Sequence, residues 1–142
     1  MERTRPPPMQ HVLLLGGTLL LLGALLYVWS GQNEEPVGPA AVAVGAEAPD
    51  ETLLFYVDPV FLLAERANVL DALLVAAERG NVTVEVTYGF SYGAFVQSIG
   101  GHKNEGNCGW LWDKNGVRGD RAADRATVVD GDEVRWHWGC EG

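Results

Sequence analysis

Residues 68–88 read NVLDALLVAAERGNVTVEVTY and carry the clearest structural signals in the chain. Apolar residues recur at helical spacing from Leu70 to Ala77, and Asn68 in front of them is a natural N-cap. Residues 82–88 then alternate valine with threonine or glutamate, which is the pattern of a half-buried strand. This stretch therefore predicts an amphipathic helix followed directly by a strand.

Further short strands are predicted on both sides of this stretch, from alternation, strand-forming residues and turn signals. The first two are expected to be separate strands joined by a turn at Asp58 and Pro59. The predicted strands lie at residues 52–57, 60–63, 95–99, 110–113 and 133–138. One helix among several strands indicates an α+β fold, with the helix packed across one face of a mixed sheet. A β-grasp arrangement, with the last strand beside the first, fits this order.

The N-terminal part contains an uncharged apolar run at residues 12–29, VLLLGGTLLLLGALLYVW. As a helix it spans about 27 Å, close to the hydrocarbon thickness of a bilayer. Arg3 and Arg5 precede it and two glutamates follow it, so the N-terminus is expected inside. We predict a cytoplasmic segment at 1–11 and a transmembrane signal anchor at 12–30.

Cleavage after Ser30 is the alternative for this leader, and it would release a secreted protein. In both cases the remainder is extracytoplasmic. Residues 31–50 are rich in Pro, Ala, Gly and Glu and lack aromatic residues, so we expect a flexible linker there. Residues 51–142 are expected to form the folded extracytoplasmic domain.

The charge balance of the 142 residues is acidic, with 10 Lys and Arg against 19 Asp and Glu and a formal net charge of −9. Nucleic-acid binding needs a basic surface, so nucleic acid is not expected as a partner. No glycine-x-serine-x-glycine elbow or patterned triad is present, and we expect neither an enzyme nor a cofactor.

The pairing of the two cysteines is predicted from the strand register. If residues 109–113 run antiparallel to residues 133–139 with Trp110 opposite Trp138, then Cys108 lies opposite Cys140. An oxidising compartment favours a disulfide between such a pair. The alternative is a zinc site in which His102 and His137 join the two cysteines.

Four tryptophans share one face of this predicted strand pair. They could form the core beneath the helix, or they could offer an aromatic surface to a planar or apolar ligand. The candidate ligand-binding residues are Trp110, Trp112, Trp136, Trp138, Tyr92 and Phe95. Asn81, in an Asn-Val-Thr acceptor pattern, is a candidate glycosylation site or an ordinary turn residue.

Four short motifs occur in an order that resembles a known family. They are NVLDAL from Asn68, FVQSIGG from Phe95, GWLWDKNG from Gly109 and VDGDEVRW from Val129. Together, over residues 52–138, they are similar to the transcobalamin-like C-terminal domain, a small β-grasp module. The resemblance implies an extracellular, non-catalytic module, which in some relatives is part of a cobalamin-binding protein.

These observations lead us to expect a membrane-anchored, extracytoplasmic binding module. The partner is expected to be an unknown small molecule or a surface protein, bound through the loops at residues 89–93 and 100–109. A structural or adhesive module of a surface assembly, without a small-molecule ligand, is the alternative.

Overall fold

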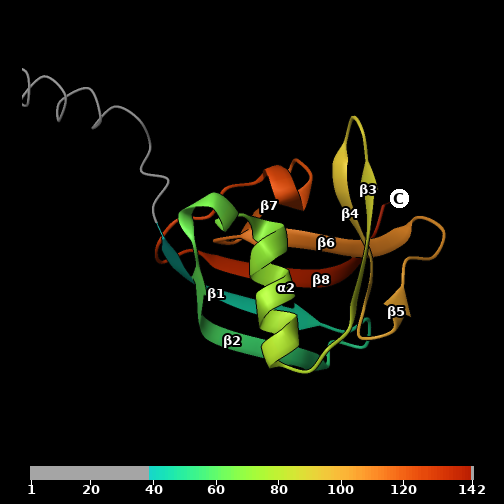
Figure 1. The fold of residues 1–142 in the computed structure, drawn as a ribbon. Helices are drawn as coiled ribbons and strands as arrows, with labels where there is room; N and C mark the ends of the chain where they lie inside the picture. The colour runs from blue at the N-terminus through green and yellow to red at the C-terminus, as the bar shows by residue number, and fades with distance from the viewer. Residues whose placement is uncertain (1–38, 142) are drawn as a thin grey trace, which may run out of the picture. The chain divides into compact units, whose positions relative to one another are not determined.

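The computed structural model describes residues 39–141, which form two sheets and one α-helix (Figure 1). Two short 3₁₀ turns, Ala64–Arg66 and Ala123–Arg125, lie in the connections. The helix is α2, Val69–Arg79. The strands are β1 Ala40–Glu47, β2 Leu53–Leu62, β3 Val84–Gly89, β4 Gly93–Ile99, β5 His102–Lys103, β6 Cys108–Lys114, β7 Val117–Arg118 and β8 Glu133–Cys140.

The larger sheet has the strand order β2-β1-β8-β6-β7, and the smaller sheet has the order β3-β4-β5. β1 and β8 run parallel, whereas the other neighbours in the larger sheet are antiparallel. Helix α2 lies across β1 and β2, and the β3–β4 hairpin crosses one end of β6 and β8 (Figure 1). The expected mixed α+β class, dominated by sheet and with one helix, is confirmed.

The expectation of a flexible linker at residues 31–50 is wrong for Ala40–Glu47, which form the strand β1 between β2 and β8. Val42, Val44 and Ala46 are almost fully buried beneath the helix. The prediction failed because it considered only the composition of residues 31–50 and not the strands that pair with them. A central strand shares hydrogen bonds with neighbours on both sides, and small side chains suit the close approach of a helix. Residues 31–38 lie outside the described part.

The opposite face of β1 is covered as well. A Cβ at Gly45 would lie only 3.1 Å from the ring of Tyr56, on β2. The guanidinium carbon of Arg135, on β8, lies 5.3 Å from the centre of the same ring. Because both faces are covered, β1 shows no polar alternation, and the folded unit starts before residue 51.

The two strands expected around Asp58 and Pro59 are one strand, β2. Val42 pairs with Val60 and Val44 pairs with Val57, so Asp58 and Pro59 together oppose a single residue of β1. This bulge absorbs the proline, and β2 is an edge strand of the described sheet, where a missing N–H is tolerated. Asp58 and Pro59, which predict a turn in the sequence, therefore form a bulge within β2.

Helix α2 begins where the sequence predicts. The backbone N–H of Asp71 donates to Asn68 Oδ1 at 2.8 Å, and Asn68 Nδ2 donates to the Asp71 carboxylate at 2.8 Å. The face formed by Val69, Leu73 and Ala76 is fully buried against the sheet. Asn68 is therefore confirmed as the N-cap.

The closing strand β8 lies beside β1, with Ala43 opposite Glu133 and Ala46 opposite Trp136. We expected it beside the first strand, which the sequence placed at residues 52–57; that strand is instead separated from β8 by β1. No helix within residues 39–141 has the length and apolar character to cross a bilayer. The predicted anchor at residues 12–30 lies outside the described residues.

The buried position of β1 gives a first prediction. A chain that starts at Glu51 will lack a cooperative thermal unfolding transition, because β2 and β8 lose the strand that joins them. A chain that starts at Val37, where the compact unit begins, will retain the transition. Circular dichroism during heating compares the two. Equal unfolding temperatures would show that β1 is dispensable.

Candidate functional site

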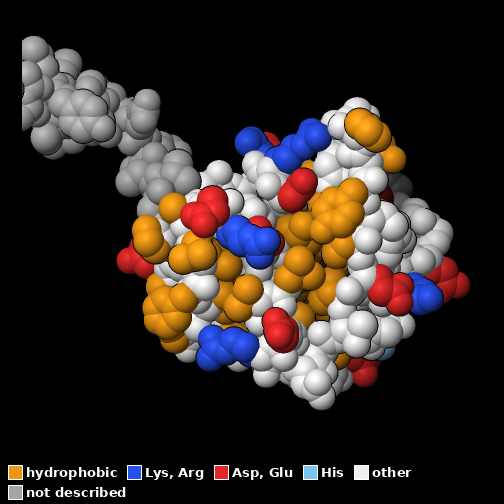
Figure 2. Space-filling model, viewed as in Figure 1, with side chains coloured by type: hydrophobic (Ala, Val, Ile, Leu, Met, Phe, Trp, Pro, Cys, Tyr) orange, Lys and Arg blue, Asp and Glu red, His pale blue; other side chains and the backbone are white. Residues whose placement is uncertain are grey.

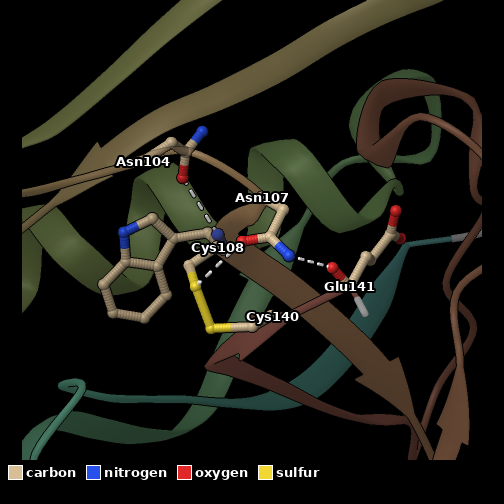
Figure 3. The surroundings of a disulfide bond; sticks show 6 residues. Asn104, Asn107, Cys108, Cys140 and Glu141 are labelled. Atoms are coloured by element: carbon tan, nitrogen blue, oxygen red, sulfur yellow. Dashed lines mark hydrogen bonds between the residues drawn. A yellow bond between two sulfur atoms is a disulfide. The ribbon is translucent and has the colours of Figure 1, made fainter.

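The pairing of β6 with β8 brings together most of the residues singled out in the sequence. Trp110 lies opposite Trp138, Trp112 opposite Trp136, and Cys108 opposite Cys140, as the alternation predicts. The two cysteines form a disulfide with an S–S distance of 1.99 Å (Figure 3). The predicted disulfide is confirmed.

The structure does not assemble the alternative zinc site. Both cysteine sulfurs are used by the disulfide. His137 Nε2 lies 3.1 Å from Asp113 Oδ2, close enough for an ion pair but not aligned for a hydrogen bond. Within residues 39–141, no three His, Cys, Asp or Glu side chains are placed to hold a metal ion.

The four tryptophans divide into two kinds. Trp110 and Trp136 are core residues, 6% and 2% exposed, whereas Trp112 and Trp138 are half-buried at its margin. Trp110 packs edge-to-face on Trp138, with ring centres 5.7 Å apart, and its Nε1 donates to the carbonyl of His102 at 2.7 Å. The rings therefore do not form one exposed surface of four.

Two hollows open where β4 lies near β6, and both are lined by Phe95, Trp110 and Leu111. We call them together the β4–β6 groove. The smaller has a volume of about 150 Å³ and the larger about 340 Å³. The smaller is also lined by Ala94, Val96, Trp112, Arg118, Gly119, Arg121, Ala122, Ala123 and Trp136. The larger extends to Asn104, Gly106, Asn107, Cys108, Gly109, Gly139 and Glu141.

The side chain of Asn104 joins the two sides of the groove. Its Nδ2 donates to the carbonyl of Val96 on β4 at 2.9 Å, and its Oδ1 accepts from the N–H of Trp110 on β6 at 3.0 Å. Figure 3 shows this side chain beside the disulfide. The separation of the two strands is therefore set by a specific polar contact.

Glycine 119 positions the half-buried ring of Trp112. The indole lies so close to Gly119 that a Cβ there would overlap it. The N–H of Gly119 also donates to the carbonyl of Trp112 at 2.9 Å. The ring is therefore held at the wall of the smaller hollow.

Two exposed arginines stand at the rim of the smaller hollow, and each has a carboxylate neighbour. Arg118 Nε lies 3.2 Å from Asp113, and Arg121 Nε lies 3.1 Å from Asp120. The hydrogen bond from Arg121, together with its charge, lowers the pKa of Asp120. Exposed pairs of this kind contribute little to stability, so the arginines remain available to a ligand.

The indole Nε1 of Trp136 is buried and has no hydrogen-bond partner among the described residues. Trp136 lines the smaller hollow. A buried indole N–H without a partner costs about 1–3 kcal/mol of stability. The nitrogen has almost no exposed surface, so it lies behind the wall of the hollow and not on it.

The structure therefore brings together Phe95, Trp110, Trp112 and Trp136 but not the other candidates. Trp138 does not line the groove, and Tyr92 lies apart, at the end of the β3–β4 hairpin. Sequence reasoning missed Leu111, Gly119, Arg118 and Arg121, three of which lie in or beside a polar stretch without a repeating pattern. Asn81 is exposed after α2, and its glycosylation stays a prediction.

The fold and groove define a small, sheet-dominated α+β module with an aromatic cleft between its two sheets. A family model described as a domain of unknown function, DUF4430, matches residues 68–139. The chain belongs to this family. A search of curated proteins finds no match.

Seventeen chains of solved structure share the fold. One is a Ruminococcus gnavus protein provisionally named a metal binding protein; it is 18% identical, with a TM-score of 0.54, and the match covers 72% of this chain and 99% of that one. Another is haptocorrin in complex with Cbi, 16% identical, with a TM-score of 0.58. That match covers 78% of this chain but 27% of the haptocorrin chain.

The contact of Trp112 with Gly119 gives a second prediction. Gly119→Ala will displace the indole, lower the free energy of unfolding by about 1–3 kcal/mol and expose the ring to iodide quenching. In a Trp112→Ala background the same change will cost much less, because nothing is left to overlap. An equal cost in both backgrounds would place the ring elsewhere.

The disulfide gives a third prediction. Cys108 and Cys140 are 32 residues apart, so the bond will contribute about 3–4 kcal/mol on the chain-entropy account. Urea unfolding of the oxidised protein and of a Cys108→Ser, Cys140→Ser double variant measures the difference. A variant as stable as the wild type would show that the bond does not constrain the unfolded chain.

Proposed function

We propose that this chain is a membrane-tethered, extracytoplasmic and non-catalytic binding module. Residues 39–141 would form a β-grasp domain, and residues 12–30 would anchor it in the membrane. Its ligand would be a small molecule held in the β4–β6 groove. The main support is the β4–β6 groove itself, whose smaller hollow is walled by Phe95 and three tryptophans and is bordered by two arginines.

The groove implies the chemistry of the ligand. Phe95, which is 51% exposed, and the half-buried Trp112 offer apolar surface to a flat or apolar body. The two rim arginines suit an anionic group on that ligand. The volumes of the hollows fit a molecule of moderate size.

A corrinoid is one reasonable probe, because haptocorrin has this fold in part of its chain. The shared portion is only 27% of that chain, so the groove alone would have to hold a corrinoid here. A smaller aromatic anion needs less contact area, which the groove alone would supply. We therefore pair cobalamin with the dye 1-anilinonaphthalene-8-sulfonate as the two probes.

A structural role in a surface assembly is the second candidate. The described strand β2 has a free edge, and Leu53 and Phe61 on it are 54% and 73% exposed. Exposed apolar residues on an edge strand favour strand-to-strand pairing with another chain. Sedimentation that shows a concentration-dependent assembly, with no response to either probe, would favour this role.

The fourth prediction tests the groove. Phe95→Ala will weaken binding of the dye, or of cobalamin, by about tenfold or more, because the contact with one exposed phenylalanine is lost. Phe90→Ala, at an exposed phenylalanine at the end of the β3–β4 hairpin, is the matched control and will bind as the wild type does. Tryptophan emission follows the titration. Failure of both probes to bind, or equal losses in the two variants, would count against the groove.

A further inference from the structure

The end of the β3–β4 hairpin carries three exposed aromatic side chains. Tyr88, Phe90 and Tyr92, here called the aromatic tip, are 70%, 110% and 70% exposed. Figure 2 shows hydrophobic side chains gathered at this end of the hairpin. The surrounding sequence, residues 86–101, contains no Asp, Glu, Lys or Arg. The tip is thus an uncharged projection on an acidic module.

The tip is held in place by the neighbouring 3₁₀ turn. Arg125 Nη1 donates to the carbonyl of Ser91 at 2.9 Å, and Asp124 Oδ1 accepts from the N–H of Ala94 at 2.9 Å. Gly93 has a φ of +85° and lies against Asp124. These contacts fix the hairpin end, so a partner would not have to order it on binding.

Tyrosine rings suit the interfacial region of a bilayer because they combine an apolar body with a polar end, and the phenylalanine at the same tip adds apolar surface. Charge supports the same partner. Arg118, Arg121 and Arg125 are neighbours of the hairpin, yet Asp113, Asp120 and Asp124 accompany them. The tip region is therefore close to neutral, and it can approach lipid without the repulsion that the acidic remainder would meet.

The corrected start of the fold adds a geometric reason. With β1 beginning at Ala40, only the ten residues 30–39 separate it from the apolar run that ends at Trp29. Ten residues reach at most about 35 Å. On the proposed anchoring, the module would stay within this distance of the bilayer, where lipid has a high effective concentration.

We infer that the aromatic tip inserts into the lipid interface of the membrane that holds the chain. This inference rests on the proposed anchoring. It gives the module a second point of attachment and a preferred orientation, with the β3–β4 hairpin directed toward the lipid. The expected attachment is mainly hydrophobic, so it depends little on salt.

The test uses the compact unit Val37–Gly142 without the apolar run, together with vesicles of phosphatidylcholine. A Phe90→Ser, Tyr92→Ser variant will lower the fraction that sediments with vesicles by about tenfold. Leu63→Ser, Val129→Ser is the matched control, because these side chains are 64% and 45% exposed and lie outside the hairpin. The control will sediment as the wild type does.

Fluorescence quenching tests directly whether the tip enters the bilayer. In a Phe90→Trp variant, brominated lipid will quench the added emission if residue 90 enters the bilayer. No sedimentation of the wild type, equal losses in both double variants, or an unquenched Trp at position 90 would overturn the inference.

The experiments distinguish a failure of tip insertion from a failure of the proposed ligand binding. Probe binding to the β4–β6 groove is measured without vesicles, so a tip variant will keep it. An N-terminal sequence of the mature protein tests the anchor separately. Cleavage after Ser30 would remove the anchor. Sedimentation with vesicles would still show whether the tip of the released domain binds lipid.

Discussion

The pairing of β1 with both β2 and β8 is the constraint on which the rest of the structure depends. Without β1, strand β2 is separated from β8, β6 and β7, and α2 loses part of the sheet surface that it covers. The strand can serve in this way because its side chains are small. Val44 and Ala46 lie under the helix with no exposed surface, and Gly45 accepts the Tyr56 ring on the other face.

The features that the sequence predicts well are those set by local pattern. Asn68 identifies the helix start because capping depends on neighbouring backbone groups, and strand alternation fixes the register in which Cys108 meets Cys140. β1 escapes prediction because burial on both faces removes alternation, and alanine is a poor strand signal. The bulge at Asp58 and Pro59 escapes because only the pairing with β1 makes it a bulge.

The candidate site shows the same limit. The alternation of residues along β6 and β8 predicts that all four tryptophans lie on one face of the sheet. It does not predict which residues cover that face. Trp110 and Trp136 are buried by residues distant in sequence, whereas Trp112 is left at the margin of the core. Gly119 and the rim arginines belong to a connection without a repeating pattern, so their place beside the ring follows only from the folded chain.

The β3–β4 hairpin links the two surfaces to which we assign function. Ala94 and Val96 are buried and border the smaller hollow, the exposed Phe95 lines both hollows, and the aromatic tip lies at the far end of the same two strands. Asn104 holds β4 to β6 at the groove, while Asp124 and Arg125 hold the hairpin near its end. On the proposed function and the inferred insertion, a ligand at Phe95 and a membrane at the tip would act on the same hairpin. Insertion of the tip would therefore also set the orientation of the groove to the membrane surface.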